Sequence, residues 1–139
     1  MKTISLAVLG LLATTGFALA DDPSGTWRLD NGKITVKVRP CGGEVCANIV
    51  GLKEPTYKDG SAKIDKYNKN PALRNRPLMG LAVLSNMKPA GDNTWKGNIY
   101  NADDGRTYSA TMTMNGSTMK LQGCVAGIFC KTNVFKKVN

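Results

Sequence analysis

The alternation of apolar and polar residues along the chain constrains its fold more than any other feature. Within residues 33–39, Ile34, Val36 and Val38 alternate with lysine, threonine and arginine. Successive side chains of a strand point to opposite faces, so such a run predicts a half-buried β-strand with one apolar face. The same pattern recurs within residues 94–101, 105–114 and 117–125.

Turn-forming residues separate these runs. Asp30-Asn31-Gly32, Asp103-Asp104-Gly105 and Asn115-Gly116 contain the N-G and D-G pairs that supply positive φ in tight hairpins. Short turns join nearly all neighbours, which predicts an all-β fold: a small eight-stranded antiparallel up-and-down barrel, with an open sandwich as the alternative. The predicted strands lie near residues 25–29, 33–40, 45–52, 78–87, 94–101, 105–114, 117–125 and 128–137.

Residues 53–77 interrupt this rhythm, because they show neither strand nor helix periodicity. They predict one long loop between strands 3 and 4, and a connection of this length is usually functional or disordered. Seven basic residues in the loop outnumber three acidic ones. Residues 70–74 predict a single helical turn, since Pro71 is tolerated at its start.

The first twenty residues predict a cleavable signal peptide. Lys2 supplies a positive charge, an apolar run covers residues 4–12, and Ala18-Leu19-Ala20 provides the small residues before a cleavage site. The run is short for a membrane span, and no other segment is apolar enough to cross a bilayer. We therefore expect a β-barrel domain over residues 21–139, exported to the periplasm or secreted, with no transmembrane segment in the mature form.

The chain contains four cysteines, an even number that predicts two disulfides in an exported domain. Three pairings are possible. The spacing favours Cys41–Cys46 and Cys124–Cys130, because each pair brackets a glycine-containing turn between strand-like flanks. A zinc site is the alternative, disfavoured because the spacing is not C-x₂-C and because export favours oxidation.

Composition narrows the classes of function. The chain has no histidine, so the commonest general base and metal ligand are both absent, and no serine or carboxylate pair forms a catalytic pattern. We therefore expect no enzyme activity, no cofactor and no metal site. Asp103-Asp104 lacks the further oxygens of a calcium loop, and the methionines lack the clustering of a copper site. Nucleic acid is not expected as a partner of an exported protein without a basic, aromatic-rich strand face.

Several motifs, taken in order, resemble a known bacterial family. They are Gly25-Thr26-Trp27, the hairpin of residues 41–46, the segment 70–80, Trp95–Tyr100 and Asp104–Tyr108. Their order and spacing resemble the exported proteins of domain-of-unknown-function family 2147, from about residue 24 to the C-terminus. The resemblance implies a lipocalin-like barrel and brings no established activity.

A fainter resemblance, to lipocalins proper, rests on the G-x-W motif formed by Gly25 and Trp27. It implies a basic residue on the last strand that contacts the tryptophan. Lys131 is the candidate for that role.

Inner-face residues are the first candidates for ligand binding. Trp27, Trp95, Tyr108 and Met112 fall on the predicted inner face of the barrel. Eight-stranded barrels either fill with side chains or hold one small ligand, so these residues either form the core or line a pocket.

Two arginines are the second candidates. Arg74 and Arg76 bracket Asn75 just before strand 4, where a pair of guanidinium groups at the barrel mouth would hold a carboxylate or phosphate. The alternative is that they pair with Asp65 or bind loop carbonyls.

Two functions are compatible with these features. The favoured one is an exported small-molecule-binding protein for an apolar or amphipathic anionic ligand. The alternative is a basic cell-envelope interaction protein with a filled barrel, whose 53–77 loop binds polyanions or a protein partner, consistent with the net charge of +9.

Overall fold

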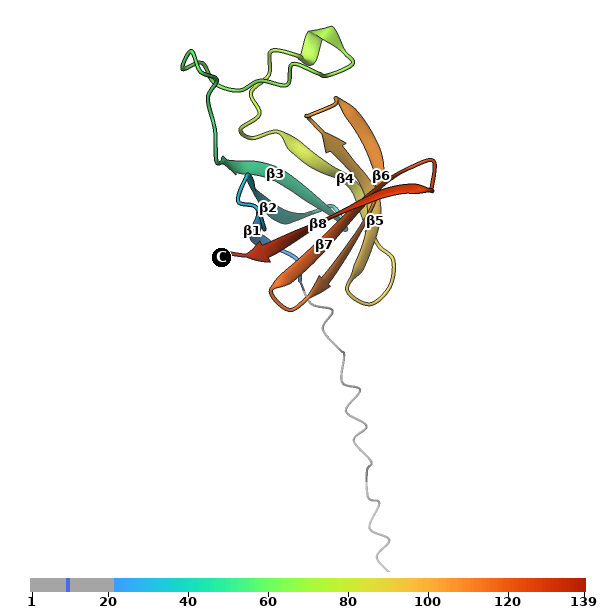
Figure 1. The fold of residues 1–139 in the computed structure, drawn as a ribbon. Helices are drawn as coiled ribbons and strands as arrows, with labels where there is room; N and C mark the ends of the chain where they lie inside the picture. Colours follow the sequence, from blue (N-terminus) through green and yellow to red (C-terminus); the bar gives the residue numbers. More distant parts are fainter. Residues whose placement is uncertain (1–9, 11–21) are drawn as a thin grey trace, which may run out of the picture.

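The structure, a computed structural model, is a closed antiparallel β-barrel (Figure 1). It describes Gly10 and residues 22–139. Except for Gly10, the predicted signal peptide lies outside the described residues and stays a prediction. The strands are β1 (Gly25–Leu29), β2 (Ile34–Cys41), β3 (Glu44–Leu52), β4 (Ala82–Pro89), β5 (Thr94–Asn101), β6 (Arg106–Asn115), β7 (Thr118–Val125) and β8 (Phe129–Lys137).

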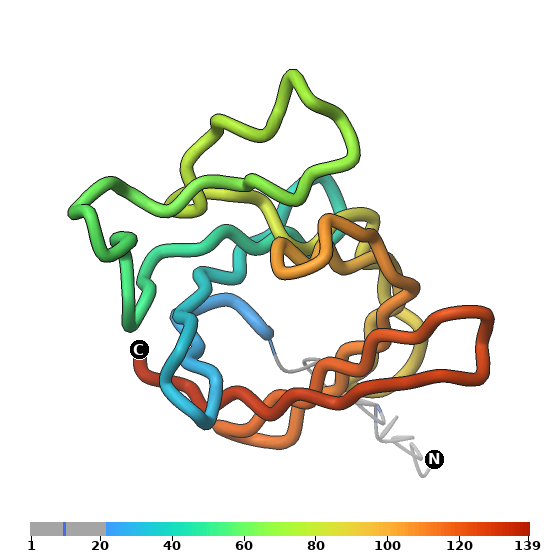
Figure 2. Tube along the Cα trace, turned by 45° about the horizontal axis from the view of Figure 1, so that its top comes forward, coloured from blue at the N-terminus to red at the C-terminus, as the bar shows by residue number. Residues whose placement is uncertain are grey.

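The strand order confirms the predicted up-and-down topology. Each strand pairs antiparallel with the next, and β8 pairs with β1, so the sheet has no free edge. Figure 2 shows this closed ring from one end. Because direction alternates, the β1–β2, β3–β4, β5–β6 and β7–β8 connections lie at one end, here called the open end. The start of β1, the end of β8 and the other three turns lie at the closed end.

β4 begins later than predicted, at Ala82 instead of residue 78. Residues 78–81 form a turn, in which the amide of Leu81 donates to the carbonyl of Leu78 at 3.1 Å. Gly80 has a φ of 85°, a left-handed conformation that interrupts an extended strand. The apolar residues of this segment led to the prediction of a strand. Leu81 is buried, but it belongs to the turn that precedes β4.

The predicted inner faces form the core. Ala110, Met112 and Met114 of β6 are buried, whereas the residues of β6 that alternate with them are exposed or only partly buried. Each large apolar side chain buried in this way stabilises the fold by about 1.5–3 kcal/mol. The cluster consists of Trp27, Val36, Val38, Val45, Ala47, Leu84, Met87, Trp95, Ala110, Met112, Met114, Met119, Leu121 and Phe135.

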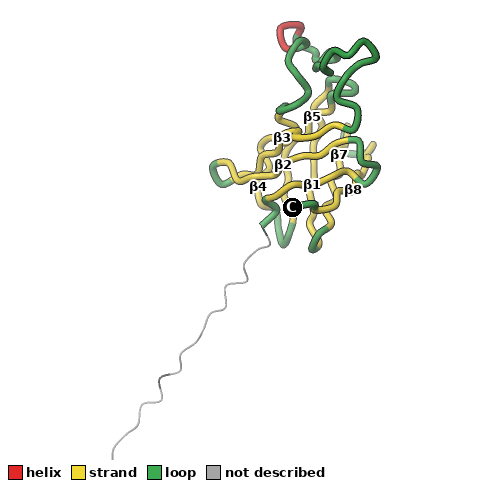
Figure 3. Tube along the Cα trace, turned by 90° about the vertical axis from the view of Figure 1, so that its left-hand side faces the viewer, coloured by secondary structure: helices red, strands yellow, loops and turns green. Residues whose placement is uncertain are grey.

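The segment from 53 to 81 stands out from the open end as one long loop (Figure 3). Two isolated bridges brace it, Thr56 with Ala62 and Ile64 with Pro77. The predicted helical turn is present as a 3₁₀ helix, η1 (Pro71–Leu73), and the side chain of Asn70 accepts from the amide of Ala72 at 3.1 Å.

Both predicted disulfides are present. Cys41–Cys46 closes the β2–β3 hairpin and Cys124–Cys130 closes the β7–β8 hairpin, each across neighbouring strands. In the part of the chain that the structure describes, no helix is long and apolar enough to span a bilayer.

Candidate functional site

Trp27 seals the closed end of the barrel. Its side chain is fully buried, and its indole N–H donates to the carbonyl of Pro23 at 2.9 Å. The ammonium of Lys137 lies 5.8 Å from the ring centroid, on the residue that pairs with Trp27 across β1 and β8. The basic partner of the tryptophan is therefore Lys137. The assignment to Lys131 was wrong, because Lys131 lies six residues further from the C-terminus and pairs with Gly123 instead.

Trp95 and Met112 also belong to the core. They face each other across β5 and β6 and are 6% and 0% exposed. With Trp27 they fill the closed half of the barrel, and none of the three lines the open-end cavities described below.

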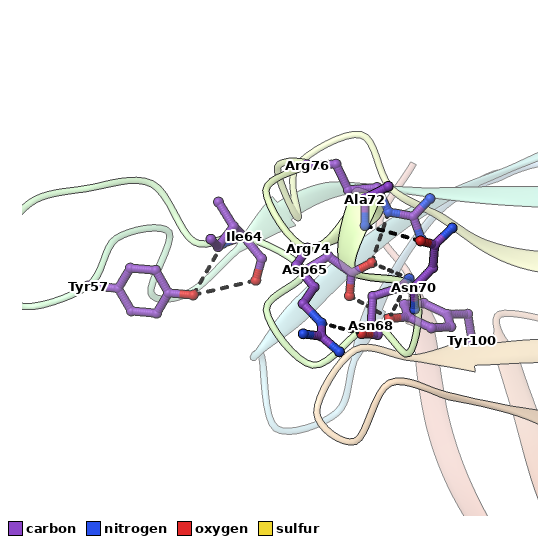
Figure 4. Close-up of polar contacts among 9 residues, drawn as sticks. All are labelled: Tyr57, Ile64, Asp65, Asn68, Asn70, Ala72, Arg74, Arg76 and Tyr100. Atoms are coloured by element: carbon purple, nitrogen blue, oxygen red, sulfur yellow. Dashed lines mark hydrogen bonds and ion pairs between the residues drawn. The ribbon is translucent and has the colours of Figure 1, made fainter.

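Arg76 is bound by a buried carboxylate. Asp65 is fully buried in the 53–81 loop and accepts from the guanidinium Nε of Arg76 at 2.9 Å (Figure 4). The same carboxylate accepts from the amide of Asn68 at 2.9 Å and from the hydroxyl of Tyr100. The guanidinium also lies 5.7 Å from the centre of the Tyr100 ring. Because Tyr100 lies on β5, this cluster fastens the loop to the barrel wall.

The hydrogen bonds of this cluster determine its protonation. Burial raises the pKa of Asp65, but hydrogen bonds from Tyr100, Asn68 and Arg76 outweigh it, and the pKa lies below the ordinary 3.8. Burial, followed by the hydrogen bond and charge of Asp65, raises the pKa of Tyr100 above the ordinary 10.0. Asp65 is therefore ionised and Tyr100 neutral near neutral pH.

Arg74 has a structural contact as well. Its Nε donates to the carbonyl of Asn68 at 2.7 Å. The two arginines thus make the contacts predicted as the alternative to anion binding: Arg76 pairs with Asp65, and Arg74 binds a loop carbonyl. Arg76 also lines an open cleft of about 660 Å³ on the outer face, together with Lys69 and Arg106.

A cavity of about 570 Å³ lies at the open end, between the β5–β6 strands and the β7–β8 hairpin. We call it the hairpin cavity. Its volume is in the range of small-molecule sites. It is lined by Ile99, Asn101, Asp104, Tyr108, Gly123, Ile128, Phe129, Cys130 and Lys131.

Gly123 helps to create this space. A side-chain carbon at this position would meet Ile99 at 3.4 Å and Tyr108 at 3.6 Å, which are ordinary contact distances. A methyl group at residue 123 would therefore fit beside these two side chains, and a larger side chain would reduce the space of the cavity that Gly123 lines.

Tyr108 is the one predicted inner-face aromatic that lines this cavity. It is half-buried, and its hydroxyl donates to a carboxylate oxygen of Asp104 in the β5–β6 turn. This hydrogen bond, followed by burial, raises the pKa of Tyr108 above 10.0. The hydrogen bond holds the phenol ring of Tyr108 against the cavity wall and occupies one oxygen of the Asp104 carboxylate.

Lys131 brings a positive charge to the same cavity. The β7–β8 register is regular, so Lys131 lies on the same face of β8 as buried Phe135. Among the described residues, no carboxylate lies within 4.0 Å of its ammonium. The cavity thus combines a largely apolar wall, one free cation and one carboxylate, Asp104, which is hydrogen-bonded to Tyr108; the free cation is suited to the anionic group of an amphiphile.

A second cavity, of about 440 Å³, adjoins the first at the open end, and Asn101 lines both. Its rim carries three lysines, of which Lys63 is within 3.7 Å of the Glu54 carboxylate. Its apolar wall consists of Leu29, Ile34, Ile49, Leu52, Leu78, Ala102 and Val83.

Sequence reasoning missed most residues of the hairpin cavity. Ile99, Ile128 and Phe129 were not singled out, and Lys131 was assigned to another role. The alternation of Phe129, Lys131, Asn133 and Phe135 along β8 was the available signal. Val125, the last residue of β7, is 42% exposed because the β7–β8 hairpin extends beyond the neighbouring strands (Figure 1).

An eight-stranded, closed, up-and-down barrel with a cavity at one end is a lipocalin-like protein. The chain belongs to the family described as "Uncharacterized protein conserved in bacteria (DUF2147)", whose sequence profile matches residues 25–137. This confirms the resemblance found in the sequence.

A solved structure supports the same fold. It is described as "Protein HP1028 from the human pathogen Helicobacter pylori belongs to the lipocalin family". The TM-score is 0.72 at 27% sequence identity, over 85% of this chain and 84% of that chain. No curated protein matches the sequence.

Proposed function

We propose that the protein binds a small amphipathic molecule with an anionic end in the hairpin cavity. The carrying observation is that Lys131, a cation free of carboxylate partners among the described residues, lines a largely apolar cavity of about 570 Å³. The lipocalin-like fold supports this function, since a barrel of eight strands is wide enough to hold one small ligand where side chains do not fill it. Export after cleavage near Ala20 would place this activity outside the cytoplasm.

In this arrangement the apolar part of the ligand contacts Ile99, Tyr108 and Phe129. Its anionic group pairs with the ammonium of Lys131. Because Lys131 is exposed, an ion pair of this kind contributes up to about 1 kcal/mol, or roughly a fivefold gain in affinity. Trp27, Trp95 and Met112 stabilise the barrel and do not touch the ligand. Arg74 and Arg76 fix the loop.

The test compares decanoate with decanol, which has a similar chain and no charge, by native mass spectrometry and thermal shift. We expect decanoate to bind the protein more tightly than decanol. Lys131→Glu should remove this preference by reversing the charge. Lys120→Glu is the matched control, because Lys120 is exposed on the outer face of β7 and the net charge changes equally.

A second variant tests the cavity instead of the charge. Gly123→Leu should fill the space beside Ile99 and Tyr108 and abolish binding of both probes. Unchanged decanoate binding by both Lys131→Glu and Gly123→Leu would refute the proposed site. No decanoate binding by the unaltered protein would refute the ligand class.

A further inference from the structure

The tip of the β7–β8 hairpin exposes large apolar side chains to solvent. Ile128 and Phe129 are 77% and 74% exposed, the two highest values among the large apolar residues that the structure describes. Val125, on the other side of the turn, is 42% exposed. We call these three residues the apolar tip. Scattered single apolar residues are ordinary on a surface, but three clustered at a projecting tip indicate a contact.

The apolar tip is held in a defined shape. Cys124 pairs with Cys130 at its base, and the two cysteines are cross-strand neighbours. Ala126 and Gly127 have φ of 53° and 68°, and the amide of Ile128 donates to the carbonyl of Val125 at 3.2 Å. This is the geometry of a type I′ hairpin turn. A preorganised tip loses little conformational freedom when its side chains are buried.

The apolar tip projects away from the rest of the molecule. Figures 1 and 2, which view the barrel from different directions, both show the β7–β8 hairpin extending beyond its neighbours. A projecting tip can penetrate a surface that the barrel itself does not enter.

We propose that the apolar tip inserts into the surface of an anionic phospholipid bilayer. Three side chains of at most about 250 Å² each cover less than the ~800 Å² per partner that a stable protein interface needs. Binding to a bilayer does not require an interface of that area, because the burial of apolar side chains and the attraction of nearby cations to anionic lipids both contribute to it. Lys131 follows the tip on β8, Arg106 opens the neighbouring strand β6, and the chain has a net charge of +9. Asp103 and Asp104 of the β5–β6 turn oppose this attraction locally.

The position of the tip relates it to the hairpin cavity. Ile128 and Phe129 line that cavity, so insertion of the tip would bring the cavity opening to the lipid surface. The inference does not depend on ligand binding, since it rests on the exposure, shape and charge of the hairpin.

The experiment is flotation of the mature protein with vesicles of phosphatidylcholine and phosphatidylglycerol. Vesicles of phosphatidylcholine alone carry no net charge, so binding to them measures the apolar contribution to vesicle binding without the electrostatic one. We expect binding to the mixed vesicles, weaker binding to phosphatidylcholine, and a loss of about tenfold per side chain in Ile128→Ser/Phe129→Ser. The matched control is Leu73→Ser/Met79→Ser, which removes exposed apolar side chains from the 53–81 loop and should bind as before.

A fluorescence measurement reports insertion directly. Phe129→Trp should shift its emission to the blue when mixed vesicles are added, and Leu73→Trp should not. Equal vesicle binding by both serine double variants would overturn the proposal, as would an unchanged Phe129→Trp spectrum. Tip-dependent self-association without vesicle binding would assign the surface to a second copy of the chain and also overturn it.

Discussion

The carboxylate of Asp65 accepts a hydrogen bond from the hydroxyl of Tyr100, although 35 residues separate them in the chain. Asp65 belongs to the 53–81 loop and Tyr100 to β5, so this contact joins the middle of the loop to the barrel, together with the hydrogen bond that the Asn68 amide donates to the Tyr100 hydroxyl at 3.2 Å. The long connection, which has few apolar contacts of its own, is thereby held in one place.

Asp65→Asn should loosen this attachment. The amide cannot replace the charge that Arg76 and Tyr100 face, and loss of one charge-assisted hydrogen bond in a buried site costs about 2 kcal/mol. We expect a lower unfolding free energy in denaturant titration and faster hydrogen exchange within residues 63–78. Asp59→Asn is the control, because Asp59 is exposed and bonds only to nearby Ser61. Unaltered exchange in Asp65→Asn would contradict the role of the cluster.

The same cluster should make stability depend on pH at both extremes. The pKa of Asp65 is lowered on folding, so its contribution is complete above 3.8 and is lost as pH falls through the lower folded value. The pKa of Tyr100 is raised on folding, so its contribution is complete below 10.0 and is lost as pH rises through the higher folded value. Unfolding free energy measured against pH should decline in both windows. In Tyr100→Phe the alkaline decline should be smaller.

Gly105→Ala should displace the loop by steric conflict. A side-chain carbon at Gly105 would lie 1.8 Å from the carbonyl oxygen of Tyr67, which is backbone and cannot rotate away. Gly32→Ala is a matched control, because Gly32 has a similar positive φ, 76° against 70°, with nothing within 4 Å. Both variants share the cost of a left-handed alanine, about 1 kcal/mol. Only Gly105→Ala should increase hydrogen exchange at Tyr67 and Asn68.

Removing the second disulfide should destabilise the protein modestly. Cys124 and Cys130 are six residues apart, and closing so short a loop restricts the unfolded chain by about 2 kcal/mol. Cys124→Ser/Cys130→Ser should therefore lower the unfolding free energy by about that amount while the circular dichroism of the barrel is retained. Collapse of the β-sheet signal at ambient temperature would show that this hairpin is needed for folding.

The mature N-terminus should begin at Asp21. Pro23 is buried, and its carbonyl accepts the indole N–H of Trp27, so the chain from residue 23 onward belongs to the barrel. Cleavage after Ala20 leaves this contact intact. Intact-mass measurement of the protein exported from a bacterial host checks the position, and retention of residues 1–20 would refute the signal peptide. Starting the chain at Thr26 should remove the contact with Trp27 and lower the thermal midpoint.

Local patterns were sufficient to predict most of the fold. The period-two alternation gave the strands, because a strand in a barrel has one buried face. Asp30-Asn31-Gly32 and Asn115-Gly116 marked hairpins through the backbone conformations they allow. The short spacing of Cys41 and Cys46 led to the right pairing, since a hairpin brings residues this close in the chain near each other on neighbouring strands. In each case the responsible interaction lies within a few residues along the chain.

The candidate site depended on tertiary structure. Alternation showed that Trp27, Tyr108 and Met112 point inward, but not at which depth of the barrel each side chain lies. Depth follows from strand register and tilt around the whole ring, and it places Trp27 and Met112 in the packed half and Tyr108 beside the cavity. Arg76 likewise has Asp65 as its partner only because the loop folds back on itself. The sequence by itself thus determined a disulfide-linked, eight-stranded barrel from local periodicity and turns. The position of the cavity, the free cation of Lys131 and the projecting apolar tip depend on packing between residues far apart in the chain.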